Sequence, residues 1–118
     1  MNLLLAAIWE NHPQHAKVFA WLTGKSILLC PLAQLGFLRV STNKKAINAP
    51  MNKAKELLNQ FAQERDAEWI PDDLVPLQSH PKTSDEVTDH YLADLAAAHG
   101  ARLATLDQKI SHKAVAIV

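Results

Sequence analysis

The chain has 118 residues, of which 48% are hydrophobic and 20% are charged, and its formal net charge is zero with histidine neutral. This composition excludes a disordered chain, and the length predicts a single domain, residues 1–118, that can bury a core. Zero net charge excludes a global field that attracts nucleic acid, so any such contact has to come from local patches.

The first third of the chain predicts a helix and a strand after an ambiguous apolar segment. Leu3–Trp9 is apolar but too short for its period to distinguish a strand from a helix. A helix then starts with Asn11 as its cap and Pro13 in its first turn, and it stops at Gly24. The residues of its inward face recur at helical spacing, namely His15, Val18, Phe19 and Leu22. Ser26–Cys30 is a short apolar run that is typical of a buried strand.

Two helices and a second strand are predicted in the middle of the chain. Pro31 suits the first turn of a helix over Leu32–Val40, whose nearly continuous apolar positions indicate packing on more than one side. Met51–Arg65 is clearly amphipathic. Its apolar face consists of Ala54, Leu57, Leu58 and Phe61. Glu68–Ile70 fits a short strand that closes at Pro71.

A further helix opens the last third of the chain. Thr83 and Glu86 have the spacing of a capping box, which predicts a helix that runs to His99. Its predicted inward residues are Val87, Tyr91 and Leu95. Gly100 stands at the position of a helix stop.

Two strands follow this helix, Arg102–Leu106 and a final edge strand, Val115–Val118. Helices and strands therefore alternate along the chain. This alternation predicts an α/β protein, specifically a three-layer α/β/α sandwich over a mainly parallel central sheet.

Two features of the sequence indicate in which cellular compartment the protein is expected. Cys30 is the single cysteine, so no internal disulfide can form, which fits the reducing cytoplasm. The apolar run Leu3–Ile8 is too short to cross a bilayer and has no basic region before it, so we expect neither a signal peptide nor a membrane span.

Two aspartates coincide with the ends of the last predicted elements. Asp89 falls near the start of a helix, where the macrodipole favours an anion, and Asp107 falls where a strand ends. Each alone is explained as a surface residue or a turn former. Together they mark the carboxyl edge of a parallel sheet, where ligands of open sheets usually bind. Because hard cations take oxygen ligands, the pair predicts a divalent-cation site.

These carboxylates belong to a set of segments that resembles the PIN-domain nucleases, in particular the VapC-type toxins of bacterial toxin–antitoxin pairs. The segments are Asn2–Ala6, Pro31–Val40, Trp69–Leu74, Val87–Leu92 and Leu103–Asp107. Each is moderately specific alone, and their order and spacing over almost the whole chain make the resemblance strong.

The resemblance implies an endoribonuclease that depends on Mg²⁺ or Mn²⁺, acts on an RNA substrate, binds a cognate antitoxin and forms a homodimer. It assigns the cation, and with it catalysis, to Asp89 and Asp107. Gln34, in the helix after the second strand, takes a place where many relatives carry Glu. Thr105 would orient Asp107 through a hydroxyl hydrogen bond. With Gln34 and Thr105, Asn2 makes up a second tier of site residues.

The resemblance also implies a departure at the start of the chain. The family's fourth acidic place is an Asp that ends the first strand, within Asp-x-Asn before the first helix. Asn2 matches this Asn, so the Asp would precede Met1. We expect either that Asn2–Ala7 is drawn into strand pairing or that a partner chain supplies the missing contacts. We also expect a weakened or inactive nuclease, unless the true start codon lies upstream.

Other polar residues have two interpretations each. Asp94 lies five residues after Asp89, so it is predicted to face solvent or a helix seam. Asp72 and Asp73 either edge the site or, preferably, cap a helix before Leu74. Arg39 either contacts phosphate or extends to the surface. A lysine group is a solvated face or a path for RNA: Lys44, Lys45, Lys53 and Lys55.

The aromatic residues and two rival functions complete the predictions. Trp9, Trp21 and Trp69 suggest base stacking, although Trp21 fits packing, and Trp9 with Phe19 fits an antitoxin-binding groove.

The main rival function is a catalytically silent PIN-like module that binds an antitoxin or another chain. A phosphoacceptor domain of the receiver type ranks lower, because its N-terminal acidic pair is absent.

Overall fold

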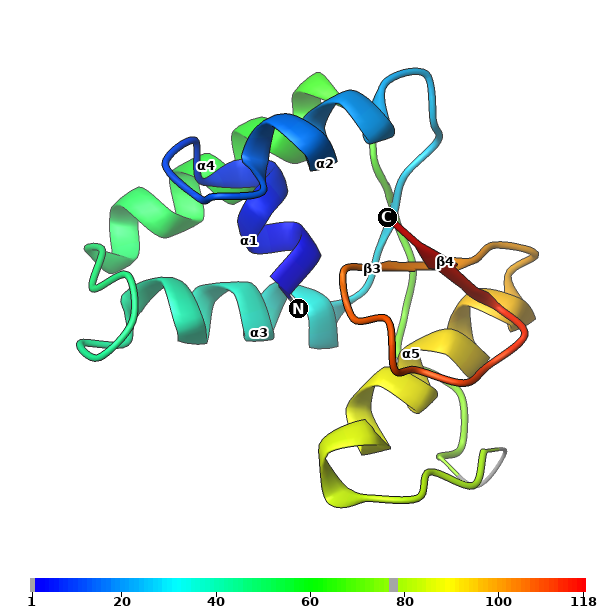
Figure 1. Ribbon diagram of the computed structural model, residues 1–118. Helices are drawn as coiled ribbons and strands as arrows, with labels where there is room; N and C mark the ends of the chain where they lie inside the picture. Colours follow the sequence, from blue (N-terminus) through cyan, green and yellow to red (C-terminus); the bar gives the residue numbers. More distant parts are fainter. Residues whose placement is uncertain (1, 77–78) are drawn as a thin grey trace. The chain divides into compact units, whose positions relative to one another are not determined.

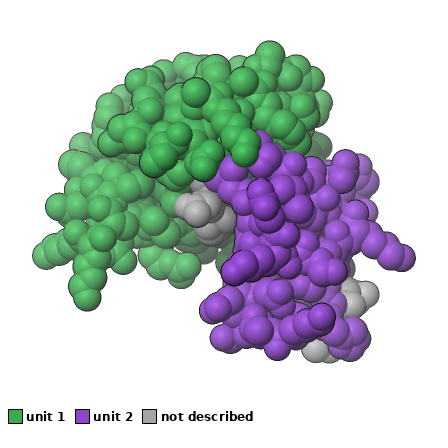
Figure 2. Space-filling model, viewed as in Figure 1, with its two compact units in different colours: residues 1–71 green, residues 72–118 purple. Residues whose placement is uncertain are grey.

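The computed structural model describes residues 2–76 and 79–118, apart from the side chain of Asn2. The chain divides into two compact units, Met1–Pro71 and Asp72–Val118, which are coloured green and purple in Figure 2. Each unit combines helices with one pair of parallel strands.

From Asn2 onward, the first unit consists of four helices and one short strand pair, and its helices pack on one another (Figure 1). Its elements are α1 (Asn2–Ile8), α2 (His15–Leu22), β1 (Leu28–Leu29), α3 (Pro31–Thr42), α4 (Met51–Glu64) and β2 (Glu68–Trp69). In the parallel pair, Leu28 lies opposite Glu68 and Leu29 lies opposite Trp69. Cys30, 5% exposed, lies between β1 and the first residue of α3.

The segment that opens the chain is a helix, so the predicted strand pairing of Asn2–Ala7 is wrong. Four consecutive residues of α1 are buried, namely Leu4, Leu5, Ala6 and Ala7. The helix packs against α2, α3 and α4, which cover it from several sides. A helix satisfies its backbone hydrogen bonds within itself, whereas a lone strand needs a neighbour. That difference explains why a short apolar segment with helices around it becomes a helix.

The helix α2 forms where it was predicted, but it starts at His15, and the residues from Asn11 to Pro13 make turns before it. Val18 and Leu22 are buried, whereas Phe19 is 48% exposed, so its predicted inward position is wrong. The Arg65 guanidinium lies 4.5 Å from the centre of the Phe19 ring, so a cation covers this ring in place of the core.

The helices α3 and α4 follow the predicted pattern closely and pack against each other. The side chain of Phe37 in α3 is fully buried. In α4 the buried residues are Ala54, Leu58, Phe61 and Ala62. Ala62 thus takes the place predicted for Leu57, which is half-buried.

The second unit consists of one turn of 3₁₀-helix, one α-helix and a strand pair among its described residues. These elements are η1 (Ser84–Glu86), α5 (Val87–Ala98), β3 (Leu103–Thr105) and β4 (Val115–Ile117). The strands are parallel, with Leu103 opposite Val115. Ala93, Ile110 and Val115 form the core cluster, against which Leu103 packs.

The start of α5 differs from the prediction. The Thr83 side chain makes no cap hydrogen bond, and the carboxylate of Glu86 accepts from the backbone N–H of Lys82 at 3.0 Å. The predicted capping box is therefore not formed. Val87 is 52% exposed, whereas the predicted inward residue Leu95 is buried. The predicted cap before Leu74 is also wrong, because residues 72–76 contain no helix.

The predicted α/β class is confirmed in its coarse form, since helices and strands mix and every strand pair found in the described residues is parallel. These strands make two separate two-stranded sheets. A single central sheet in a three-layer sandwich, and one domain over 1–118, therefore stay predictions. No helix within residues 2–76 and 79–118 has the length and apolar character to cross a membrane.

Candidate functional site

The two aspartates singled out by the sequence both lie in the second unit. Asp89 lies in the first turn of α5 and is half-buried. The positive end of the helix macrodipole lies at this turn. The residue thus presents a negative charge at an end of the helix that water can still reach.

Asp107 lies two residues after β3 and is exposed. Its Oδ1 accepts a hydrogen bond of 2.9 Å from the backbone N–H of Lys109. Its own N–H donates to the Thr105 hydroxyl at 3.0 Å. Thr105 is buried, so its hydroxyl fixes the backbone of Asp107, and the bond to the carboxylate that the sequence predicted is not the one observed.

Segment lengths indicate how Asp89 and Asp107 relate within this unit. Residues 99–102 join α5 to β3, the two elements pack together, and the chain reverses between them (Figure 1). From Ala98 back to Asp89 the helix rises by about 14 Å. β3 covers Leu103–Thr105, and a bend at Leu106 follows before Asp107. Asp89 and Asp107 therefore lie toward the ends of α5 and β3 that are farthest along the chain from residues 99–102.

The donor set of this region fits a hydrated hard cation. Two carboxylates that water reaches match the way Mg²⁺ is held, by one or two carboxylates and several waters. Within the described residues, no group of three or more His, Cys, Asp or Glu is arranged to hold a metal ion.

Gln34 lies in the first unit, where it is half-buried on α3. It lines an open cavity of about 480 Å³ between α3, α4 and β2. Lys55 and Trp69 line the same cavity, and Trp69 is 49% exposed. This groove combines an amide, a cation, the carboxylate of Glu56 and an open aromatic face. Asn2 is the first residue of α1, and its side chain lies outside the described structure.

A contact that the sequence did not predict ties α5 to the segment after Asp107. The Asp94 carboxylate lies 2.7 Å from His112 Nε2, and both side chains are largely buried. His112 Nδ1 accepts from the backbone N–H of Ala114 at 2.9 Å, which assigns the proton of the neutral ring to Nε2. Nε2–H then donates to Asp94. The predicted solvent or seam position of Asp94 is wrong, because the returning loop covers it.

Two electrostatic effects act on this pair. Burial raises the pKa of Asp94, but hydrogen bonds from Ser79 and His112 and the charges of His112 and His90 outweigh it. They hold the pKa below its ordinary value of 3.8. His90 is itself buried, its ring lies edge-on to His112 at 5.7 Å, and its Nδ1 has no hydrogen-bond partner within the described structure.

The spacing of Asp94 and His112 is the one sequence feature that could have indicated this contact. Asp94 and His112 are 18 residues apart, the same separation as Asp89 and Asp107. In each pair the first residue lies in α5 and the second lies after the end of β3. The prediction used this spacing for the carboxylates and did not extend it to the histidine.

These observations define an α/β protein with accessible carboxylates at a helix start and a strand end. No family model matches the chain. Ribonuclease VapC38 of Mycobacterium tuberculosis is 33% identical over 118 residues, which cover 91% of this chain and 82% of that protein. Ribonuclease VapC44 of the same species is 33% identical over 98% of this chain and 88% of its own length. Ribonuclease VapC39 of the same species is 28% identical over 98% of this chain and 91% of its own length.

Similarity of this extent, over most of the length of the compared proteins, shows a common family. The chain belongs to the VapC family of PIN-domain toxins, which confirms the resemblance that its motifs carry.

Proposed function

We propose that this chain is the toxin of a toxin–antitoxin pair and that it is an endoribonuclease that depends on Mg²⁺ or Mn²⁺. The observation that carries the proposal is the 33% identity to ribonucleases VapC38 and VapC44 over most of their length. The carboxylates of Asp89 and Asp107, at the start of α5 and just past β3, supply the chemistry that such a reaction requires.

In this mechanism Asp89 and Asp107 hold the cation. When bound, the cation makes a water more acidic and neutralises the charge that develops on the phosphodiester. The bonds to Thr105 and Lys109 fix the turn that carries Asp107. The contact of Asp94 with His112 holds the following segment on α5 and so limits how far Asp107 moves.

The substrate of the proposed reaction fits the groove at Gln34. Lys55 offers a cation to a phosphate, and the exposed face of Trp69 offers a stacking surface to a base. Gln34 adds a carbonyl oxygen that accepts from a water or binds a cation weakly. The groove thus suits single-stranded RNA better than a rigid duplex, whose bases are already stacked.

A second candidate is the silent binding module. Two observations favour it. The described residues contain no cluster of three or more metal-ligating side chains, and α3 and α4 expose large apolar side chains at Leu35 (63%) and Met51 (51%). Exposed apolar residues of this size fit a partner surface.

One experiment separates the candidates. Labelled single-stranded RNA is incubated with the native chain in Mg²⁺, in Mn²⁺ and in EDTA. We expect weak cleavage with either cation and none in EDTA. Asp89→Asn and Asp107→Asn each lower the rate at least about a hundredfold, because a lost ligand removes several kcal/mol of charge stabilisation.

The matched control is Asp66→Asn, at an exposed aspartate just after α4 that lies outside the proposed site and keeps its left-handed backbone as asparagine, and it keeps the native rate. Circular dichroism of each variant checks that it is folded. A native chain that is folded and binds a partner protein, but leaves RNA intact at every concentration of both cations, contradicts the nuclease proposal and supports the silent module.

A further inference from the structure

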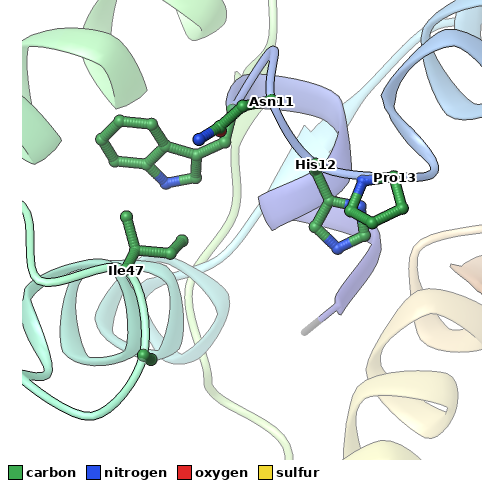
Figure 3. Close-up of a pocket in the computed structure, with 6 residues that line it drawn as sticks. Asn11, His12, Pro13 and Ile47 are labelled. Carbon is green, nitrogen blue, oxygen red and sulfur yellow. The ribbon is translucent and has the colours of Figure 1, made fainter.

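The first unit contains a second cavity. It shares no lining residue with the groove at Gln34. It is a cavity of about 320 Å³ between the turn that joins α1 to α2 and the loop that follows α3 (Figure 3). Its lining residues are Trp9, Asn11, His12, Pro13, Ala46 and Ile47. The volume falls at the small end of ligand pockets, which span about 300–1,000 Å³.

The indole of Trp9 is a fixed wall of this cavity. Its Nε1–H donates to the hydroxyl of Ser41 at 2.9 Å, and the Ser41 side chain is fully buried. The ring stacks on Phe37 with centroids 6.3 Å apart and an angle of 18° between the planes. Because the indole is already held, a planar ligand that stacks on it costs little further side-chain entropy.

The turn supplies polar groups on the rim. His12 Nδ1 accepts from the backbone N–H of Gln14 at 3.0 Å, so the neutral ring carries its proton on Nε2 and can donate it to a ligand. Asn11 is exposed and offers a donor and an acceptor on one carboxamide. In Figure 3 the side chains of Asn11 and His12 from the turn and Ile47 from the loop surround the same space.

Charge beside the cavity favours an anionic ligand. The lining loop continues from two exposed lysines, Lys44 and Lys45. In the two lining segments, residues 9–13 and 43–47, the one acidic residue is Glu10. The local charge is therefore positive although the whole chain is neutral.

We propose that this pocket, defined by Trp9, Asn11, His12 and Ile47, binds one unpaired base of single-stranded RNA and that Lys44 and Lys45 contact the adjoining phosphates. The inference rests on the proposed ribonuclease function and adds a base-binding subsite to it. A base is planar, has donors and acceptors on its edge and carries a phosphate on each side. The pocket offers a ring to stack on, a donor and an amide, and two exposed lysines directly precede its lining residue Ala46.

A peptide segment of a partner protein fits the same pocket less well. A helix or strand that docks on a surface needs a row of apolar anchors. Here one small cavity has a polar rim and lysines beside it. A peptide that occupies the pocket in place of RNA is an outcome that the experiment detects.

The test uses the full-length protein labelled with ¹⁵N, in EDTA so that no RNA is cut. AMP, CMP, GMP and UMP are titrated in turn, and the indole N–H signals of Trp9, Trp21 and Trp69 are followed. Trp9→Phe assigns the Trp9 signal. We expect the Trp9 signal to shift in a saturable way with at least one nucleotide, and Ala46→Phe, which fills the cavity with a ring, to abolish that shift.

Affinity is measured in parallel with a labelled eight-nucleotide single-stranded RNA by fluorescence anisotropy. Loss of one stacked base is expected to weaken binding about tenfold in Ala46→Phe. Ala20→Phe places the same ring at an exposed position of α2 and keeps native affinity. Asn11→Ala, which leaves the indole and its contacts in place, is expected to weaken binding by a smaller factor.

The two proposals fail in different ways. A Trp9 signal that responds to neither the nucleotides nor the RNA, or that shifts equally in Ala46→Phe, overturns the pocket inference even if the native chain cleaves RNA. A Trp9 signal that shifts only with a peptide from a partner protein also overturns it. A Trp9 shift that Ala46→Phe removes, in a chain without nuclease activity, supports the pocket and rejects the ribonuclease.

Discussion

At Asp94 two opposing effects act on one carboxyl group. Removal from water favours the neutral acid, whereas the His112 N–H, the Ser79 hydroxyl and two nearby imidazoles favour the anion. The anion prevails, so the pKa in the folded protein is lower than in the unfolded chain. Such a group contributes stability at every pH above its ordinary value, and that contribution is lost as the pH falls through the lower folded value.

This linkage predicts that the free energy of unfolding decreases on acidification from pH 5 to below the folded pKa, and that Asp94→Asn removes part of this decrease. The amide keeps the shape of the carboxylate and accepts from His112, but it does not titrate. Urea denaturation at half-unit pH steps measures both curves.

Asp73→Asn, at an exposed aspartate, is the control and keeps the native pH dependence. Parallel curves for the native chain and Asp94→Asn over the acid range contradict the prediction, because they place the titrating group elsewhere.

At the scale of elements, two helices end with the same hydrogen-bond motif but with different residues. At the end of α5, Gly100 is left-handed (φ 68°), its N–H donates to Ala97, and the next N–H donates to Ala96. At the end of α4, Asp66 is left-handed (φ 50°), and the N–H of Ala67 donates to Ala62. Both ends are Schellman motifs, in which glycine is the residue without steric cost.

Asp66→Gly is therefore expected to stabilise the protein by about 1 kcal/mol, because it relieves the left-handed conformation of a residue with a Cβ. Thermal and urea unfolding measure the change. The opposite change, Gly100→Ala, is expected to destabilise by about 1–2 kcal/mol through backbone strain alone, since a Cβ there meets nothing within 4 Å.

Gly100→Asn is the matched control for this pair, because asparagine tolerates the left-handed region and is expected to cost less than alanine. Equal losses in Gly100→Ala and Gly100→Asn contradict the strain argument.

The same elements show what sequence reasoning can and cannot reach. Gly24 and Gly100 mark their helix ends correctly because glycine is almost specific for that conformation. Asp66 gives no such signal. The segment Leu3–Trp9 was ambiguous because its burial on several sides removes the periodicity that distinguishes a helix from a strand. Phe19 was misplaced because Arg65, 46 positions later, covers it.

Some features of the candidate site could likewise be predicted from the sequence, and others could not. Asp89 and Asp107 lie at a helix start and just past a strand end as predicted, because such ends are visible in the pattern, whereas their binding of a cation stays a prediction. Asp94 with His112 was missed because a side chain from an irregular loop leaves no periodic trace. The bond between Thr105 and Asp107 was predicted for the right pair of residues and the wrong atoms, since spacing does not distinguish a backbone N–H from a carboxylate.

For the molecule as a whole, zero net charge limits how RNA can bind. Only local cations release counterions, and the exposed lysines of the first unit's loop and α4 are Lys44, Lys45, Lys53 and Lys55. Two to four phosphate contacts predict a slope of about −1.4 to −2.8 for the logarithm of the RNA affinity against that of the salt concentration. Anisotropy at 50–300 mM KCl measures it.

Lys45→Ala is expected to make this slope shallower by about 0.7, the value of one contact with single-stranded RNA. Lys25→Ala serves as the control, because the Nζ of Lys25 already donates to the carbonyl of Trp21. A native slope near zero, or one steeper than about −5, contradicts the small number of local contacts.

The single cysteine gives the first unit its own built-in reporter. The Cys30 thiol is enclosed where β1 meets α3, so a thiol reagent reacts only after that region opens. The rate of labelling in native buffer then measures how often residues 1–71 open transiently, and residues 72–118, which hold no thiol, stay silent in the same assay. RNA or a partner protein that engages the first unit would slow this reaction, which gives a readout of occupancy that needs neither cleavage nor an added dye.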